Sequence, residues 1–262
     1  MRRLTTTPSG YQSTPGKVSL LARAFPSLSF YRQLVGIVWK RSSQAKRGRY
    51  GDADWNESSH DVIEALERVG VRFEISGLQH LVNLETPCVV VGNHMSILET
   101  FVLPGVIRPI RPVTFIVKES LLTYPVFGHV MRSRDPVAVT RTNPRQDFKA
   151  VIEGGKERLA KGISLIVFPQ TTRADFLHRD EFNTIGVKLA QRADVPAVPL
   201  ALLTDAWGVG KRIKDFGKID PSKTVHLAFG EPLRVEGRGA GEHEAVIAFI
   251  QGKLQEWRDA RR

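Results

Sequence analysis

The sequence predicts an α/β fold, with a single mixed sheet flanked by helices and a basic amphipathic N-terminal helical arm in front of it. From about residue 61 onward, short apolar runs typical of buried strands alternate with longer stretches of helical periodicity. The charge is uneven, because residues 1–50 hold ten Lys and Arg and no acid and so carry +10 of the net +11. We therefore expect an arm and linker over residues 1–60 and one α/β domain over residues 61–262.

The arm has apolar side chains that recur at roughly helical spacing between Val18 and Trp39, with a break near Pro26. This pattern predicts two short amphipathic helices with a basic rim, which suit the headgroup layer of an anionic bilayer. The longest uncharged, mainly apolar stretch, Leu34–Trp39, is far shorter than the roughly 18–20 residues that cross a bilayer. An import signal and a solvated basic tail are the two alternatives, since the segment is also rich in Arg, Ser and Thr.

The elements after the arm follow in order. The polar stretch 42–60 is the expected linker. Apolar runs predict strands at Val71–Ser76, Cys88–Val91, Thr114–Val117, Val137–Thr140, Ser164–Phe168, Ala197–Leu202 and Val225–Phe229. Helical periodicity predicts helices at Asp61–Val69, Asp147–Ala160, Phe182–Arg192 and Glu242–Trp257.

Composition excludes several classes of protein. The chain has 42% hydrophobic and 25% charged residues, which is typical of a globular domain and not of a disordered one. Its one cysteine, Cys88, forms no disulfide within the chain, and no Cys/His cluster has zinc spacing. We therefore expect a core held by packing alone, with no disulfide scaffold and no structural zinc module.

A first group of polar residues follows the predicted strand Cys88–Val91. His94 lies in the loop after it, and Glu99 comes five residues later, near the start of the next helix. At a strand's carboxyl end, an imidazole oriented by a carboxylate is placed to take a proton from a hydroxyl. The alternative is structural: Ser96 and Glu99 also form a capping-box pattern, in which Glu99 bonds only to backbone N–H groups.

A second group follows the strand Ser164–Phe168. Arg173 offers a planar fork that suits a phosphate, and the hydroxyls of Thr171 and Thr172 add donors. The alternative is that Arg173 pairs with Asp175 at the surface.

Lys118 and Arg141 form a third group, because each follows or ends a predicted strand. Basic residues at two strand ends either line one anionic pocket or are simply solvated.

Four blocks, taken in order and spacing, resemble the glycerolipid acyltransferase family, which belongs to the lysophospholipid acyltransferase superfamily and includes the 1-acylglycerol-3-phosphate acyltransferases. His94 with an acid five residues later is similar to the family's first block, His-x-x-x-x-Asp. The other three blocks are Lys118 through Gly128 and on to Arg141, Phe168–Arg173, and Val195–Pro199. The resemblance covers roughly residues 62–235, so the arm lies outside it.

The resemblance implies acyl transfer from an acyl thioester, either acyl-CoA or acyl carrier protein, to the free hydroxyl of a lysophospholipid, in the first place 1-acylglycerol-3-phosphate, in phospholipid biosynthesis. It implies His94 as general base and Glu99 as its orienting partner, with no covalent enzyme intermediate, no metal and no cofactor beyond the thioester co-substrate. The substrate-binding residues that it implies are Asn93, Lys118, Arg141, Gln170, Thr171, Thr172 and Arg173.

Three positions in two of the blocks depart from the family pattern. Glu99 stands where Asp is usual, and Gln170 and Thr171 stand where the third block usually has Glu and Gly. A different lipid acceptor and a catalytically silent membrane-bound scaffold of the same fold are therefore alternatives. We expect a peripheral or monotopic protein at the cytoplasmic face of the inner membrane, with an anionic membrane surface and no nucleic acid as partner.

Overall fold

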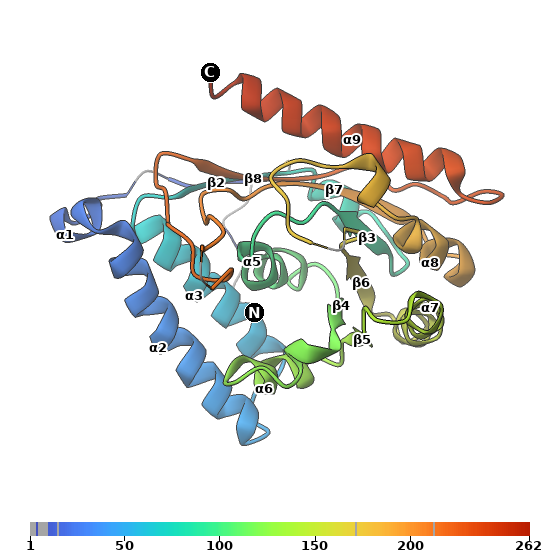
Figure 1. Cartoon of the computed structure of the whole chain (residues 1–262), viewed down its shortest axis with the longest axis horizontal. Helices are drawn as coiled ribbons and strands as arrows, with labels where there is room; N and C mark the ends of the chain where they lie inside the picture. Colours follow the sequence, from blue (N-terminus) through green and yellow to red (C-terminus); the bar gives the residue numbers. More distant parts are fainter. Residues whose placement is uncertain (1–3, 5–9, 15, 171, 212) are drawn as a thin grey trace.

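An eight-stranded mixed sheet runs through the centre of the computed structural model, which describes residues 4, 10–14, 16–170, 172–211 and 213–262 (Figure 1). The strand order is β1-β2-β8-β7-β3-β6-β4-β5. The strands are β1 (Gly10–Gln12), β2 (Arg72–Ser76), β3 (Val89–Gly92), β4 (Val113–Lys118), β5 (Val137–Val139), β6 (Ser164–Val167), β7 (Ala197–Leu203) and β8 (Thr224–Phe229).

Five adjacent strands, β7, β3, β6, β4 and β5, are parallel, so their carboxyl ends share one edge of the sheet. The register places Val90 of β3 between Ile166 of β6 and Val198 of β7. β8 is antiparallel to β7, β2 is parallel to β8, and β1 is antiparallel to β2. The expected fold class, an α/β fold with a single mixed sheet, is confirmed.

Helices cover both faces of this sheet. In Figure 1, α9 lies on one face, whereas α3 and α5 lie on the other. The helices are α1 (Leu20–Ala24), α2 (Pro26–Lys46), α3 (Asp52–Arg68), α4 (Gln79–Val82), α5 (Leu98–Ile107), α6 (Phe127–Arg132), α7 (Pro144–Ala160), α8 (Ile185–Ala193) and α9 (Ala240–Asp259), with short 3-10 turns at Glu119–Leu121 and Arg179–Glu181.

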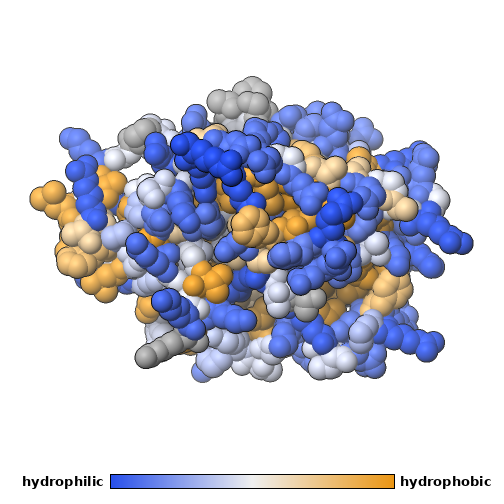
Figure 2. All heavy atoms as spheres, turned by 45° about the horizontal axis from the view of Figure 1, so that its top comes forward, coloured by the Kyte–Doolittle hydropathy of each residue, from blue (hydrophilic) through white to orange (hydrophobic). Residues whose placement is uncertain are grey.

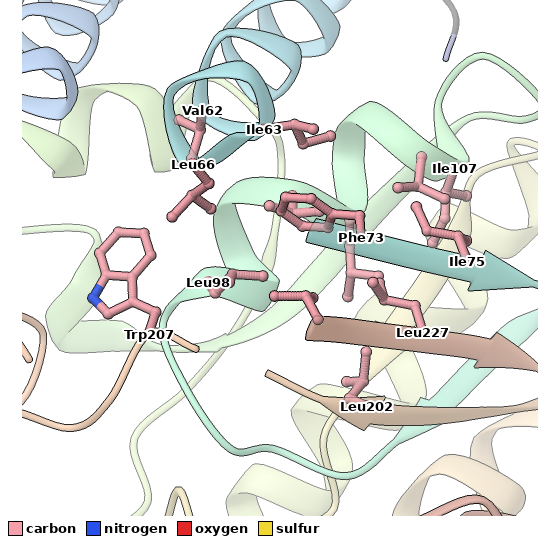
Figure 3. Close-up of a cluster of buried hydrophobic side chains, with 14 of the residues drawn as sticks. Val62, Ile63, Leu66, Phe73, Ile75, Leu98, Ile107, Leu202, Trp207 and Leu227 are labelled. Atoms are coloured by element: carbon pink, nitrogen blue, oxygen red, sulfur yellow. The ribbon is translucent and has the colours of Figure 1, made fainter. Parts of the chain in front are cut away.

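Each face of the sheet has its own hydrophobic core. Figure 3 shows the first, in which Phe73 and Leu227 from the strands meet Leu66 of α3 and Leu98 of α5. The second lies under α7, α8 and α9, where Leu189 and Ile250 pack with strand residues. Burial of these side chains stabilises the sheet by roughly 1.5–3 kcal/mol per large residue. The sheet is therefore held on both sides, and its strand ends are fixed in position.

All seven predicted strands are present, with ends within about two residues of the expected ones. The uninterrupted apolar runs of β3, β6 and β7 mark strands that are buried on both faces, whereas β2 alternates between exposed and buried residues. The sequence reading missed β1, a three-residue strand of polar composition. It pairs closely with β2, and a Cβ on Gly10 would lie 1.9 Å from the Ile75 carbonyl oxygen. Only glycine fits at that position.

The boundary expected between residues 60 and 61 falls inside a helix, since α3 begins at Asp52. The expected linker is mostly helical, because small polar side chains of this stretch are buried against α5 rather than solvated. A Cβ on Gly105 of α5 would lie 2.9 Å from the Ser59 Cβ, so the two helices approach closely. Polar composition here reflects close helix packing, and residues 52–60 belong to the body of the domain.

The arm contains α1 and α2, and α2 is longer than the short helices that the sequence predicted. Phe30 and Leu34 are buried in the first core, so α2 packs onto the body. Leu28, Val35 and Trp39 are exposed, and their spacing puts them on the opposite face of α2. Among the described residues, no helix combines the length and apolar content that crossing a membrane needs.

Candidate active site

The polar residues singled out in the sequence gather at the edge of the sheet where the parallel strands end. His94 follows β3, Arg173 follows β6, Lys118 ends β4, and Arg141 comes two residues after β5. In open α/β sheets, ligands bind outside the carboxyl ends of the strands. The topology therefore brings residues far apart in sequence to one edge.

Asn93 fixes the loop that carries His94. Its side-chain Nδ2 donates to the Leu202 carbonyl oxygen at 2.8 Å, and its Oδ1 accepts from the Leu202 N–H at 2.9 Å. The side chain is buried and both ends of its amide bond to β7. Asn93 thus ties the end of β3 to β7 and positions His94, whereas the sequence reading had placed it among substrate-binding residues.

His94 and Glu99 form the central pair of the site. The His94 Nδ1 and Glu99 Oε2 are hydrogen-bonded, while the His94 side chain is 13% exposed and Glu99 is completely buried. A carboxylate accepts hydrogen bonds, so Nδ1 carries the proton and donates it. The lone pair of the imidazole is then on Nε2, the nitrogen that can take a proton from a hydroxyl.

The other carboxylate oxygen of Glu99 is also fully engaged. Its Oε1 accepts from the backbone N–H groups of Met95 and Ser96, each at 2.9 Å, and from the Thr204 hydroxyl at 2.6 Å. The catalytic and the capping readings of Glu99 are therefore compatible, because one oxygen holds His94 and the other holds the turn before α5. The longer reach of Glu compared with Asp is no obstacle to the His94 contact.

Two residues that follow β6, Phe168 and Gln170, hold the other side of His94. The Phe168 ring stacks on the imidazole, with ring centroids 4.5 Å apart and an interplanar angle of 5°. Gln170 Oε1 accepts from the His94 backbone N–H at 2.9 Å. The ring plane and the backbone of His94 are thus set by residues that follow β6, and its Nδ1 is held by Glu99.

Arg173 reaches the free nitrogen of His94. Its Nε donates to His94 Nε2 at 3.4 Å, and its Nη1 forms an ion pair with Asp215 Oδ1 at 2.5 Å. Asp215 lies between β7 and β8, in loop 208–218, of which the structure describes residues 208–211 and 213–218. The pairing with Asp175 that the sequence left open is replaced here by pairing with Asp215.

The remaining predicted binding residues are less closely joined. Burial lowers the pKa of the Arg141 guanidinium, and the nearby Arg173 cation lowers it further, so two positive charges lie close together at this edge. Lys118 and Thr172 are exposed. Thr171 lies outside the described residues.

Two residues of this site were not found from the sequence. Thr204 follows β7. The strand predicted at Ala197–Leu202 could have pointed to Thr204, because the carboxyl end of that strand reaches the same edge of the sheet. Asp215 had no such signal, since it lies in a loop without strand or motif context. In the part of the chain that the structure describes, no group of three or more His, Cys, Asp or Glu side chains is arranged to hold a metal ion.

The Acyltransferase family model matches residues 72–203, half of the chain, and this stretch includes His94, Glu99, Arg173 and both strands that carry them. The chain belongs to the acyltransferase family. The expected enzyme class, an O-acyltransferase of lipid metabolism, is thereby confirmed.

Named relatives agree with this assignment. The acyltransferase is 30% identical to a 1-acyl-sn-glycerol-3-phosphate acyltransferase of Pseudomonas aeruginosa over 188 residues, covering 72% of this chain and 68% of the relative. It is 31% identical to the chloroplastic enzyme BAT2 of the same name from Brassica napus over 138 residues, covering 53% of this chain and 38% of the relative.

One solved structure shares the fold. The crystal structure of the 1-acyl-sn-glycerophosphate acyltransferase from Thermotoga maritima superposes with a TM-score of 0.65, covering 88% of this acyltransferase and 93% of that chain at 19% identity. At that identity the likeness concerns the fold alone, and it extends well beyond the residues of the family match.

We expect Glu99→Gln to lower kcat/KM by about a thousandfold, because a neutral amide stabilises the protonated imidazole poorly. Thr204→Val, which leaves the carboxylate in place but removes one donor, should lower kcat by about tenfold through misplacement of Glu99. Steady-state kinetics together with thermal unfolding check both.

Thr114→Val is the matched control for Thr204→Val. Thr114 is also buried and its hydroxyl also donates, at 2.7 Å to the Arg134 carbonyl oxygen, but it lies at the opposite end of β4 from the site. Thr114→Val should lower the free energy of unfolding by a comparable amount and leave kcat unchanged. If Thr204→Val likewise lost only stability, Thr204 would have no positioning role.

Proposed function

We propose that the protein transfers an acyl group from an acyl thioester, acyl-CoA or acyl carrier protein, to the free hydroxyl of 1-acylglycerol-3-phosphate in phospholipid biosynthesis. The observation that carries the proposal is the His94–Glu99 pair with Arg173 in hydrogen-bond reach of His94 Nε2. A base and a cation for phosphate then lie side by side at one sheet edge. The names of the relatives from Pseudomonas aeruginosa and Brassica napus support this acceptor.

The reaction needs one base and no covalent enzyme intermediate. His94 Nε2 takes the proton from the acceptor hydroxyl as its oxygen attacks the thioester carbonyl carbon. The carbon–sulfur bond then breaks, and the thiolate takes the same proton from the imidazolium. The products are the new ester and the free thiol, and His94 returns to its neutral form. Glu99 stabilises the imidazolium between the two proton transfers.

Arg173 is the proposed anchor for the acceptor's phosphate. A guanidinium fork binds phosphate oxygens through two parallel hydrogen bonds. In the structure the Arg173 Nη1 is paired with the Asp215 carboxylate, and the Arg173 Nε–H donates to His94 Nε2. The acceptor therefore replaces two contacts at once: its phosphate takes the place of the Asp215 carboxylate, and its hydroxyl takes the place of the Arg173 Nε–H at the imidazole.

We also propose that the arm binds an anionic membrane surface. Exposed apolar side chains lie on α1 and on the outer face of α2, among them Leu20, Leu21, Phe25 and Leu28. Figure 2 shows hydrophobic atoms gathered at the left end of the molecule, where Figure 1 places α1. The basic residues of the segment supply attraction to anionic headgroups.

The arm is joined to the loop that carries Asp215. Tyr31 Oη donates to the Gly217 carbonyl oxygen at 2.5 Å, and the Ile219 N–H donates to the Ser27 hydroxyl at 3.0 Å. Burial raises the pKa of Tyr31 to about 12, so it remains a neutral donor. In Figure 1 the orange loop lies beside the first half of α2. A membrane-bound arm would therefore place the acceptor site close to the headgroup layer where the lipid substrate lies.

The proposed reaction is tested by incubating the purified protein with acyl-CoA or acyl carrier protein donors and a panel of lysophospholipids, with products read by mass spectrometry. We expect 1-acylglycerol-3-phosphate to be acylated fastest, and His94→Ala to abolish transfer while the protein stays folded. Near-normal turnover by folded His94→Ala would refute the assignment of the base. Preference for another lysophospholipid would refute the assigned acceptor.

For the acceptor site, Asp215→Asn should lower the acceptor KM by about fivefold, because the variant removes an ion pair worth about 1 kcal/mol that competes with the phosphate. Asp205→Asn is the matched control, since Asp205 is also 23% exposed at its side chain but pairs with Arg261 and Lys223. It should leave the acceptor KM unchanged. A rise in acceptor KM for Asp215→Asn would show that Asp215 holds Arg173 in its working position instead.

For the arm, Leu28→Ser should weaken binding to vesicles of phosphatidylglycerol and phosphatidylcholine by about tenfold, because a buried Leu contributes roughly 1.5–3 kcal/mol. Leu28 is 68% exposed and Val82 is 61% exposed. Val82→Ser is the control. Val82 lies on α4, which follows the carboxyl end of β2, and that edge of the sheet is opposite to the edge that bears loop 208–218. Equal sedimentation of both variants with vesicles would refute the arm as the contact.

A further inference from the structure

Loop 208–218 presents both apolar and basic side chains to solvent. Its exposed apolar side chains are Val209, Ile213 and Phe216, at 46%, 56% and 52% exposure, and its exposed lysines are Lys211, Lys214 and Lys218. The one acid in the sequence of this loop, Asp215, pairs with Arg173, so it does not offset the charge of the lysines. Exposed apolar side chains that gather in one segment mark an interaction site.

The shape of this loop is set by its backbone and not by burial of its apolar side chains. The Gly208 N–H donates to the Lys218 carbonyl oxygen at 3.0 Å, and the Gly210 N–H donates to the Lys214 carbonyl oxygen at 3.1 Å. A Cβ on Gly217 would lie 1.7 Å from the Gly208 carbonyl oxygen, so only glycine lets the two ends of the loop approach so closely. Because the main chain closes the loop, its exposed apolar side chains are available to a partner.

The loop continues the exposed apolar surface of the arm. The Ile219 N–H donates to the Ser27 hydroxyl at 3.0 Å, and Ser27 directly precedes Leu28, which is 68% exposed. The centroid of the Phe216 ring lies 5.4 Å from that of Tyr31. Tyr31 comes three residues after Leu28, so the two are neighbours on the surface of α2. A surface that contacts Leu28 therefore lies close to Phe216 as well.

The chemistry of the loop favours a lipid surface as the partner. At the boundary between headgroups and acyl chains, apolar side chains lie about 5–10 Å deep, while lysines keep their ammonium groups at the phosphates. An acidic protein would match only the lysines. The loop also carries Asp215, the partner of the proposed phosphate anchor Arg173, so a membrane at this loop brings the lipid acceptor to its site.

We propose that loop 208–218 is a second membrane contact, in which its apolar side chains enter the headgroup layer of an anionic bilayer and its lysines bind lipid phosphates. The proposal rests on the proposed function, which places the arm at a membrane, and it assigns a second segment to that contact. Two linked contacts strengthen each other and fix the orientation of the domain on the membrane. Arg173 then faces the layer of headgroup phosphates.

Ile213→Ser is the deciding variant, because it removes one apolar side chain and keeps the backbone of the loop. We expect binding to vesicles of phosphatidylglycerol and phosphatidylcholine to weaken about tenfold, whereas Val82→Ser, at an exposed position on the opposite edge, binds like the wild type. Lys214→Gln should weaken binding to these vesicles about fivefold and leave binding to phosphatidylcholine alone unchanged. If Leu28→Ser weakened binding but folded Ile213→Ser did not, the loop would be refuted as a contact and the arm would stand.

A fluorescent label at position 213 tests insertion directly. Cys88, the only cysteine of the sequence, is completely buried, so an environment-sensitive thiol dye on Ile213→Cys reports on the loop alone. We expect its emission to rise and to shift to shorter wavelength when phosphatidylglycerol vesicles are added. Nitroxides near the headgroup end of the acyl chain should quench it more strongly than nitroxides at the far end. A label on Val82→Cys should show neither change.

These measurements separate the inference from the proposed reaction, because neither of them requires acyl transfer. The response of the label would decide whether the loop contacts lipid even if no lysophospholipid were acylated. A label that responds to acyl carrier protein but not to vesicles would overturn the lipid assignment in favour of an acidic protein. A folded, labelled protein that binds vesicles without any change in emission would overturn it as well.

Discussion

The site depends on one buried charge, the Glu99 carboxylate. A buried carboxylate that loses its partners costs about 3–5 kcal/mol, so its donors must all be in place. They come from the loop after β3, the turn before α5 and the end of β7. Satisfying Glu99 therefore locks the loop between β3 and α5 to the end of β7, and the same bonds set the imidazole of His94. The same hydrogen bonds therefore stabilise the fold and orient the proposed base.

The second constraint is the parallel arrangement of β7, β3, β6, β4 and β5. Because their carboxyl ends share one edge, each loop at that edge can contribute to the same site without long excursions. The chain after β6 makes three contacts with His94: Phe168 stacks on its ring, Gln170 holds its backbone, and Arg173 reaches its free nitrogen. Residues that follow one strand thus hold the imidazole and also reach the nitrogen that would take the acceptor's proton.

The sequence allowed the strands and the His94–Glu99 pair to be predicted because both are local signals, an apolar run and a five-residue spacing. It failed where the signal was not local. Residues 52–60 looked like a linker because Ser58 and Ser59 are polar, and only their contact with α5 explains their burial in a helix. Thr204 and Asp215 lie 105 and 42 residues from the partners that they contact, so only the folded chain shows them.

The departure from the family's third block at position 170 changes the charge of the site, because a neutral amide stands where a carboxylate is usual. With Gln170 neutral, the carboxylate that faces Arg173 comes from Asp215, in a loop attached to the arm at Ser27 and Tyr31. A carboxylate at position 170 would lie beside His94, whereas the Asp215 carboxylate belongs to the stretch between β7 and β8 that the arm contacts. The same change leaves an N–H donor at position 170. The neutral amide at position 170 therefore leaves the Asp215 carboxylate as the anion paired with Arg173, at the place where the proposed phosphate would bind.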